Sequence, residues 1–237
     1  MNEVRTLLKI SVIMCLLVAI AWLDSCVPLA SPTPAEDGLV GKGLLLGEPC
    51  SPPCWQGLVP GVSTQEDVDE FLTTSEYVGR YTTGPGRYEG IVLIRWRPRG
   101  IGWEAGRWNT FDVQDGILEI MSMYTDTEVR LGQLVDTYGP PDKFEASLSL
   151  HPEPVYILVG LFYSELGMIP DLHLTLDDPQ LTPETKVIRV WYLEPGPLEN
   201  TLATLEGKKG QPLEGFELEW LEDWHDWKGY GPVELSY

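Results

Sequence analysis

The sequence predicts an α+β fold: two helix-plus-antiparallel-sheet repeats forming one two-part domain, with a short C-terminal helix and an aromatic tail. Two segments carry capping boxes followed by the apolar spacing of a helix. After each come segments in which apolar and polar residues alternate, as in antiparallel strands with one covered face. Corresponding positions of the two helices differ by 62 or 63 residues, which indicates an internal repeat.

Residues 1–26 are predicted to be a lipoprotein signal peptide. Arg5 and Lys9 precede an apolar run at residues 10–23, which is shorter than the ~20 residues of a membrane-spanning helix. The run ends in Leu-Asp-Ser-Cys26, which resembles the bacterial lipobox. This resemblance implies that Cys26 is lipidated and holds the protein at the extracytoplasmic face of the cell membrane. Asp24 departs from the usual small residue, so a plain signal peptide or a short anchor is the alternative.

Residues 27–47 are predicted to be a flexible tether, because they begin with a stretch rich in proline and small polar residues. Cys50 and Cys54 follow in a second proline-rich segment. An exported chain meets an oxidising compartment, so we expect a disulfide between them. A zinc site would need further Cys or His ligands, and a redox pair is usually separated by two residues rather than three.

The first predicted repeat covers residues 48–124. Its helix is expected to begin at a capping box formed by Ser63 and Glu66, and to bury a stripe of apolar residues. Strands are expected at residues 90–96, 107–113 and 117–124, with a tight Asp115-Gly116 turn between the last two.

The second predicted repeat covers residues 125–193. Its helix is expected to begin at Thr125, with Glu128 completing the capping box, and to end at Gly139. Strands are expected at residues 143–150, 155–163, 169–176 and 187–193. The strand at 155–163 is apolar on both faces, which favours a central place in the sheet.

Two short motifs carry a resemblance to a known family. Gly-Val-Ser-Thr at residues 61–64 precedes the first helix, and Tyr-Gly-Pro-Pro-Asp at residues 138–142 follows the second. Together they look like the repeat of the β-lactamase-inhibitor-protein-like and BamE (SmpA/OmlA) lipoproteins, although each copy lacks the other's motif. The resemblance implies a bacterial envelope lipoprotein that binds proteins or envelope components, and it transfers no catalytic residue.

Basic residues concentrate in one predicted hairpin. Residues 80–107 hold six arginines and only two acids, and tryptophans lie between them. Arginine and tryptophan often anchor interfaces, so the hairpin is a candidate site for an acidic partner or an anionic surface. The favoured interpretation is that the arginines pair with the protein's own acids while the tryptophans fill the core. The candidate partner-binding residues are Arg95, Trp96, Arg97, Arg99, Trp103, Arg107 and Trp108.

The C-terminal region, residues 194–237, combines a short predicted helix at 197–206 with a tryptophan-rich tail. Trp220, Trp224 and Trp227 are spaced four and three apart with acids between them, as on one helical face. Docking of this face onto the sheet is the favoured interpretation. The alternative is a carbohydrate-binding or cell-wall hydrolase domain that uses these tryptophans and carboxylates.

Charge and missing motifs limit the function. The formal net charge of −20 argues against nucleic-acid binding, which needs a dense basic surface. The sequence holds three His and no metalloprotease, serine-hydrolase or nucleotide-binding motif. We therefore expect a non-catalytic binding or scaffolding module with no cofactor and no metal. Its expected partners are the membrane, through the lipid anchor, and another envelope protein or an anionic surface.

Overall fold

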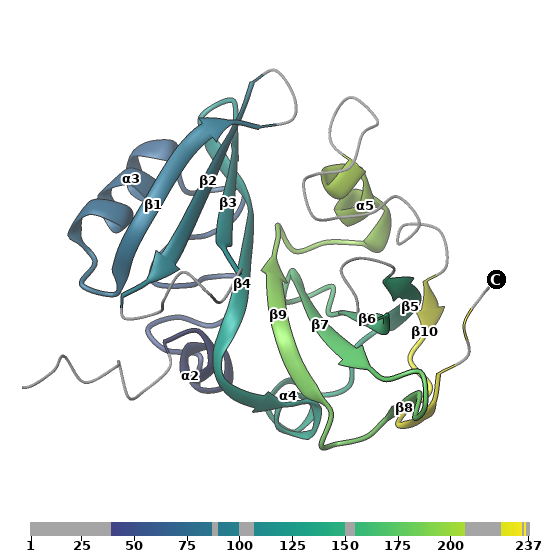
Figure 1. The fold of residues 1–237 in the computed structure, drawn as a ribbon. Coiled ribbons are helices and arrows are strands. Elements are labelled where there is room, and N and C mark those ends of the chain that lie inside the picture. Colours follow the sequence, from purple (N-terminus) through teal and green to yellow (C-terminus); the bar gives the residue numbers. More distant parts are fainter. Residues whose placement is uncertain are drawn as a thin grey trace, which may run out of the picture. The chain divides into compact units, whose positions relative to one another are not determined.

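An antiparallel sheet of nine strands dominates the computed structural model, in the order β1-β2-β3-β4-β9-β7-β6-β5-β10 (Figure 1). The structure describes residues 39–86, 90–99, 107–149, 155–206, 224–233 and 235, all within the compact unit Ala35–Tyr237. The predicted signal peptide lies outside them. The strands of this sheet are β1 Val78–Pro85, β2 Ile91–Pro98, β3 Asn109–Gln114, β4 Ile117–Arg130, β5 Lys143–Ser149, β6 Tyr156–Phe162, β7 Met168–Leu174, β9 Lys186–Tyr192 and β10 His225–Asp226.

Short elements complete the described fold. Strands β8 and β11 form a separate two-stranded sheet. The described helices each have ten residues or fewer. These elements are β8 Gln180–Leu181, β11 Gly231–Pro232, α2 Leu39–Leu46, α3 Gln65–Thr74, α4 Leu131–Tyr138 and α5 Leu198–Glu206.

The predicted α+β class is wrong: the protein is predominantly β, with one continuous sheet instead of two helix-plus-sheet repeats. The reason lies in β4, which is 14 residues long and runs through the predicted boundary between residues 124 and 125. One edge of β4 pairs with β3 and the other with β9. Strands from both predicted repeats therefore hydrogen-bond to the same strand, and the sheet has no break between them (Figure 1).

The second predicted helix begins six residues later than expected, at Leu131 rather than Thr125. Thr125 lies in β4, where its hydroxyl donates to the carbonyl oxygens of Val187 and Ile188. β-Branched side chains favour a strand, and pairing with β9 outweighs the local capping pattern. At the actual helix start the Gln133 side chain accepts a hydrogen bond from the Arg130 backbone N–H at 2.9 Å.

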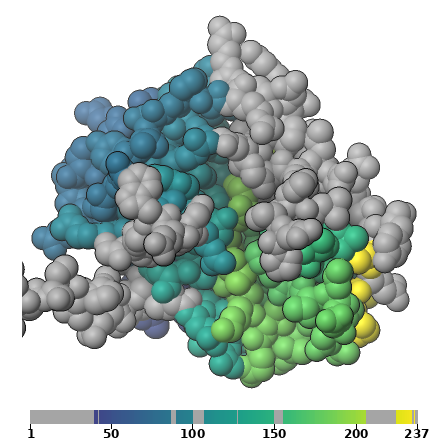
Figure 2. All heavy atoms as spheres, viewed as in Figure 1, coloured from purple at the N-terminus to yellow at the C-terminus, as the bar shows by residue number. Residues whose placement is uncertain are grey.

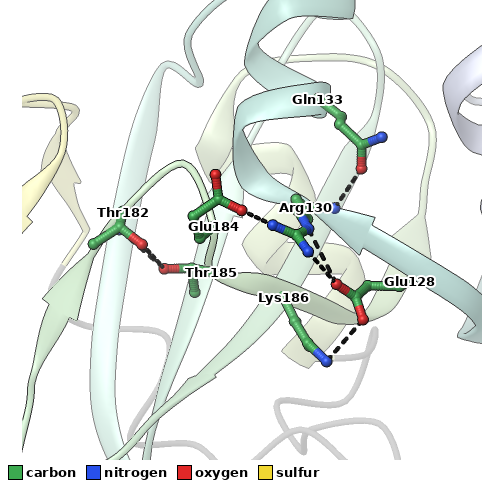
Figure 3. Close-up of polar contacts among 7 residues, drawn as sticks. All are labelled: Glu128, Arg130, Gln133, Thr182, Glu184, Thr185 and Lys186. Atoms are coloured by element: carbon green, nitrogen blue, oxygen red, sulfur yellow. Dashed lines mark hydrogen bonds and ion pairs between the residues drawn. The ribbon is translucent and has the colours of Figure 1, made fainter.

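Glu128, the predicted capping residue, instead joins an exposed ion-pair cluster (Figure 3). Its two oxygens accept from Arg130 at 2.8 Å and from Lys186 at 2.9 Å. A hydrogen bond from Lys186, and a smaller contribution from that of Arg130, hold the pKa of the Glu128 carboxyl below its usual value. Arg130 also pairs with Glu184. The cluster ties β4 to β9, although exposed ion pairs add little to stability because solvent screens them.

The first predicted helix is present, but its cap is shifted by one residue. Thr64 is the N-cap of α3, and its hydroxyl accepts from the Asp67 N–H while the Asp67 carboxylate accepts from the Thr64 N–H. Ser63, the predicted cap, accepts instead from the Val59 N–H at 2.9 Å. Asp67 supplies both the reciprocal bond and a negative charge in the first turn, which a helix N-terminus favours.

Away from the exposed edge strand β1, the sheet has buried residues on both of its faces. The first face packs against apolar residues of α2, α3 and α4, such as Val40, Val68 and Leu134. The second face packs in part against Leu202 and Leu205 of α5. Strand β6 contributes alternate residues to both clusters and lies between β5 and β7, so it is buried on both faces as predicted, although it is the seventh of the nine strands rather than central.

An aromatic cluster anchors the N-terminal part of the first face. Trp96 is fully buried and packs against Trp55, with ring centroids 5.5 Å apart, and Phe111, with centroids 5.6 Å apart; the Trp55 and Phe111 centroids are also only 6.4 Å apart. The predicted disulfide between Cys50 and Cys54 is present, and Trp55 follows it directly in the sequence. The crosslink therefore fixes the turn that delivers Trp55 into the core.

The described part of the aromatic tail, from residue 224 on, is extended rather than helical. Trp220 lies outside the described residues, whereas Trp224 and Trp227 flank the short strand β10, which pairs with β5. The Trp224 ring packs on the second face of the sheet, with its centroid 6.0 Å from that of Phe162. Extended backbone turns successive side chains in opposite directions, so the two tryptophans enter different environments.

Candidate binding surface

The structure divides the predicted arginine–tryptophan hairpin between the two faces of the sheet. Arg95 and Arg97 alternate with Trp96 along β2, so the arginines share the second face while Trp96 fills the core. This core position agrees with the favoured interpretation of the tryptophans. Arg99 is exposed just beyond the end of β2, and Trp103 lies outside the described residues.

Strand register carries polar residues across the second face. Tyr124 of β4 lies opposite Arg189 of β9, which lies opposite Asp171 of β7. Asp171 in turn lies opposite Gly160 of β6, and Gly160 opposite Glu145 of β5. Directly paired residues point to the same face, so one line of side chains crosses five neighbouring strands.

Asp171 is the electrostatic centre of this line. Its Oδ2 atom accepts hydrogen bonds of 2.7 Å from Arg189 Nε and from the indole N–H of Trp191, and Arg189 Nη2 lies 2.7 Å away as well. The residue is 1% exposed. Burial raises the pKa of the Asp171 carboxyl, and the attraction of Arg189 offsets only part of that effect. The desolvation cost thus outweighs the ion pair, as is common for buried pairs.

Arginine side chains lie over aromatic rings along the same face. Arg97 lies 4.1 Å from the centre of the Trp108 ring, and Arg189 lies 4.3 Å from that of Trp191. Tyr124 has two cationic neighbours, Arg107 at 5.4 Å and Arg189 at 5.7 Å from its ring centre. We call this set the arginine–aromatic row: Arg97, Arg107, Trp108, Tyr124, Arg189 and Trp191.

His173 is half-buried on the second face and stacks on Tyr156 with ring centroids 4.0 Å apart. Burial, together with the positive charges of Arg189 and Arg107, lowers the pKa of His173 to about 4. The imidazole is therefore neutral at pH 7. It adds an aromatic surface to this face without adding charge.

The row contains residues that the sequence pointed to and residues that it did not. Arg97, Arg107 and Trp108 belong to the predicted hairpin, whereas Tyr124, Arg189 and Trp191 come from β4 and β9. The pattern Val-Ile-Arg189-Val-Trp191 puts a charge and a tryptophan on the same side of a strand, which is the local signal for these two. Their meeting with the hairpin depends on pairing between distant strands.

The described part of the chain offers no metal site of three or more His, Cys, Asp or Glu side chains. Nor does any described helix have the length and apolarity needed to cross a membrane.

Comparison with known proteins finds no matching family model, no matching curated protein and no matching solved structure. The resemblance to the BamE-like lipoproteins therefore stays a prediction.

Proposed function

We propose that this chain is a non-catalytic, extracytoplasmic binding module, anchored to the membrane through Cys26, that binds an acidic segment of another envelope protein. The observation that carries the proposal is the placement of Arg107 and Arg189 on the ring of Tyr124. Asp171 contacts Arg189, whereas Arg107 is exposed. A partner carboxylate at Arg107 would reduce the repulsion between the two guanidinium groups.

The surroundings of Arg107 also favour such a partner. Arginine binds carboxylates through paired hydrogen bonds, and stacking on an aromatic ring holds the guanidinium plane in a fixed orientation. The chain as a whole is acidic, and within the row Arg97 and Trp191 are buried while Arg107 is exposed, so the exposed cation favours one orientation of an acidic partner.

The test is recovery of partners from the native envelope. Full-length protein would be crosslinked in membranes and purified as wild type, Arg107→Gln and Arg107→Glu. We expect recovery of the main partner to fall about twofold to fivefold for Arg107→Gln, the range of an exposed ion pair, and further for the charge reversal. Recovery from wild type should fall with added salt.

Lys186→Gln is the matched control, because Lys186 is an exposed cation in an ion pair on the far end of β9. It should leave recovery unchanged. Equal recovery with all variants would refute the role of Arg107. Arg107-dependent binding to anionic vesicles, without a protein partner, would instead assign the surface to lipid. Intact-mass analysis of the membrane fraction checks the anchor: an unmodified Cys26 still preceded by Ser25 would contradict it.

A further inference from the structure

The C-terminal strap, residues 224–233, closes a pocket against the far edge of the sheet. It is attached at one end by pairing of His225 with Phe144, and at the other by pairing of Gly231 with Leu181. Between these points the Trp227 N–H donates to the Asp142 carbonyl oxygen at 3.1 Å. A pocket of about 330 Å³ lies between the strap and the sheet. Part of the strap, yellow in Figure 2, is visible at the surface.

Aromatic rings form the walls of this pocket. Trp227 is nearly perpendicular to Phe144, with centroids 6.3 Å apart, and to Tyr230, with centroids 6.0 Å apart. Contact with two perpendicular rings fixes the orientation of the indole. Leu181 and Val233 are buried below, and Tyr230 is 42% exposed. The pocket therefore offers ring faces to a ligand that stays partly in solvent.

Among the described residues that line the pocket, Lys228 is exposed and carries a positive charge, and His225 adds an imidazole ring. The neighbouring acid Asp226 does not line the pocket and pairs with Lys143 at 2.9 Å. Among the described lining residues there is no carboxylate and no side-chain amide. Gly229, with φ of 94°, exposes bare peptide groups in a backbone conformation that other residues rarely adopt.

We infer that this pocket binds a sugar ring that carries a carboxylate. The ring faces of Trp227 and Tyr230 suit the C–H surface of a pyranose, and Lys228 suits its carboxylate. A neutral sugar would find no carboxylate or side-chain amide here to accept hydrogen bonds from its hydroxyls. An organic cation would be repelled by the positive charge of Lys228. This site uses Trp227 in an extended strap, not a helical face shared by Trp220, Trp224 and Trp227. The inference does not depend on the proposed function.

Glucuronate and glucose provide a matched pair of probes, because they differ only in the carboxylate at carbon 6. Each would be titrated against the full-length protein in detergent and followed by saturation-transfer NMR. We expect glucuronate to bind about threefold to fivefold more tightly than glucose, as an exposed ion pair allows. Lys228→Met should remove that preference and leave glucose binding unchanged, whereas Trp227→Leu should weaken both.

Lys186→Met, at a distant exposed lysine, is the control variant and should behave as wild type. Thermal unfolding of Lys228→Met should match wild type, because the side chain is exposed. Equal binding of the two sugars by wild type, or an unchanged preference in Lys228→Met, would overturn the inference. So would tighter binding of benzoate or choline than of glucuronate, because the ligand would then be an apolar acid or a cation. Arg107→Gln should leave glucuronate binding intact, which separates this site from the arginine–aromatic row.

Discussion

Replacing Asp171 with Asn tests whether the buried ion pair holds the centre of the sheet. Asn keeps an oxygen for the indole N–H of Trp191 but removes the charge that faces Arg189. Breaking a buried pair by removing one partner costs about 3–5 kcal/mol. The Arg189 side chain is 14% exposed and stacks on Trp191, so its charge remains partly stabilised in the variant, which reduces the loss of stability. We therefore expect a loss of about 2 kcal/mol in the free energy of unfolding.

Urea unfolding, followed by circular dichroism, measures this loss. With a slope of about 2 kcal/mol per M, the midpoint should fall by about 1 M at an unchanged slope. Glu128→Gln is the matched control, since it removes a carboxylate from an exposed cluster, and it should shift the midpoint much less than Asp171→Asn does.

The double variant Asp171→Leu/Arg189→Met separates the pair from its desolvation cost. Burial raises the pKa of Asp171 despite its partners, so apolar replacement of both residues should recover most of the stability that Asp171→Leu alone loses. The reasoning fails if Asp171→Asn costs no more than Glu128→Gln, or if the double variant is less stable than both single variants.

Three further predictions concern other parts of the fold. Gly160→Ala should cost about 1 kcal/mol in thermal unfolding, because a Cβ there would lie 3.3 Å from the Trp224 ring; Gly84→Ala, with open space at its Cβ, should be neutral, and equal effects would contradict the packing argument. The pKa of His173 is lowered to about 4 from 6.5, so its contribution to stability is complete above pH 6.5 and is lost as the pH falls toward 4. His173→Phe should show a smaller drop in urea midpoint over that interval, and an identical drop would exclude His173 as the cause. Cys54→Ser removes the disulfide between residues four apart and should lower the free energy of unfolding by about 2 kcal/mol. A wild-type urea midpoint that stays the same under reducing conditions would contradict this prediction.

Local patterns predicted the elements better than the fold class. The Asp115-Gly116 turn and the interior strand β6 are visible in short windows, because turn chemistry and two-sided apolarity are local properties. Strand β1 was missed because it is an edge strand with most of its residues exposed, so it carries no apolar alternation. At Thr125 a local capping pattern predicted a helix start, but the residue lies in β4 and its hydroxyl bonds to Val187 in the distant strand β9.

The candidate surface was predictable only in part for the same reason. The density of arginine and tryptophan marked Arg97, Arg107 and Trp108, which are close in sequence. Arg189 joins them only because β9 pairs with β4, and Asp171 only because β7 pairs with β9. Register between strands so far apart in sequence is set by the whole core and cannot be taken from any one segment.

The position of β9 has a consequence for how the chain folds as it is made. Strand β4 ends at Arg130, but β9, its partner on one edge, begins at Lys186, so the sheet cannot be completed until more than fifty further residues are available. During that interval β4 has an open edge that other unfolded chains can pair with. Closing so long a loop is also slow compared with forming a hairpin. Fragments ending before residue 186 should therefore aggregate rather than fold.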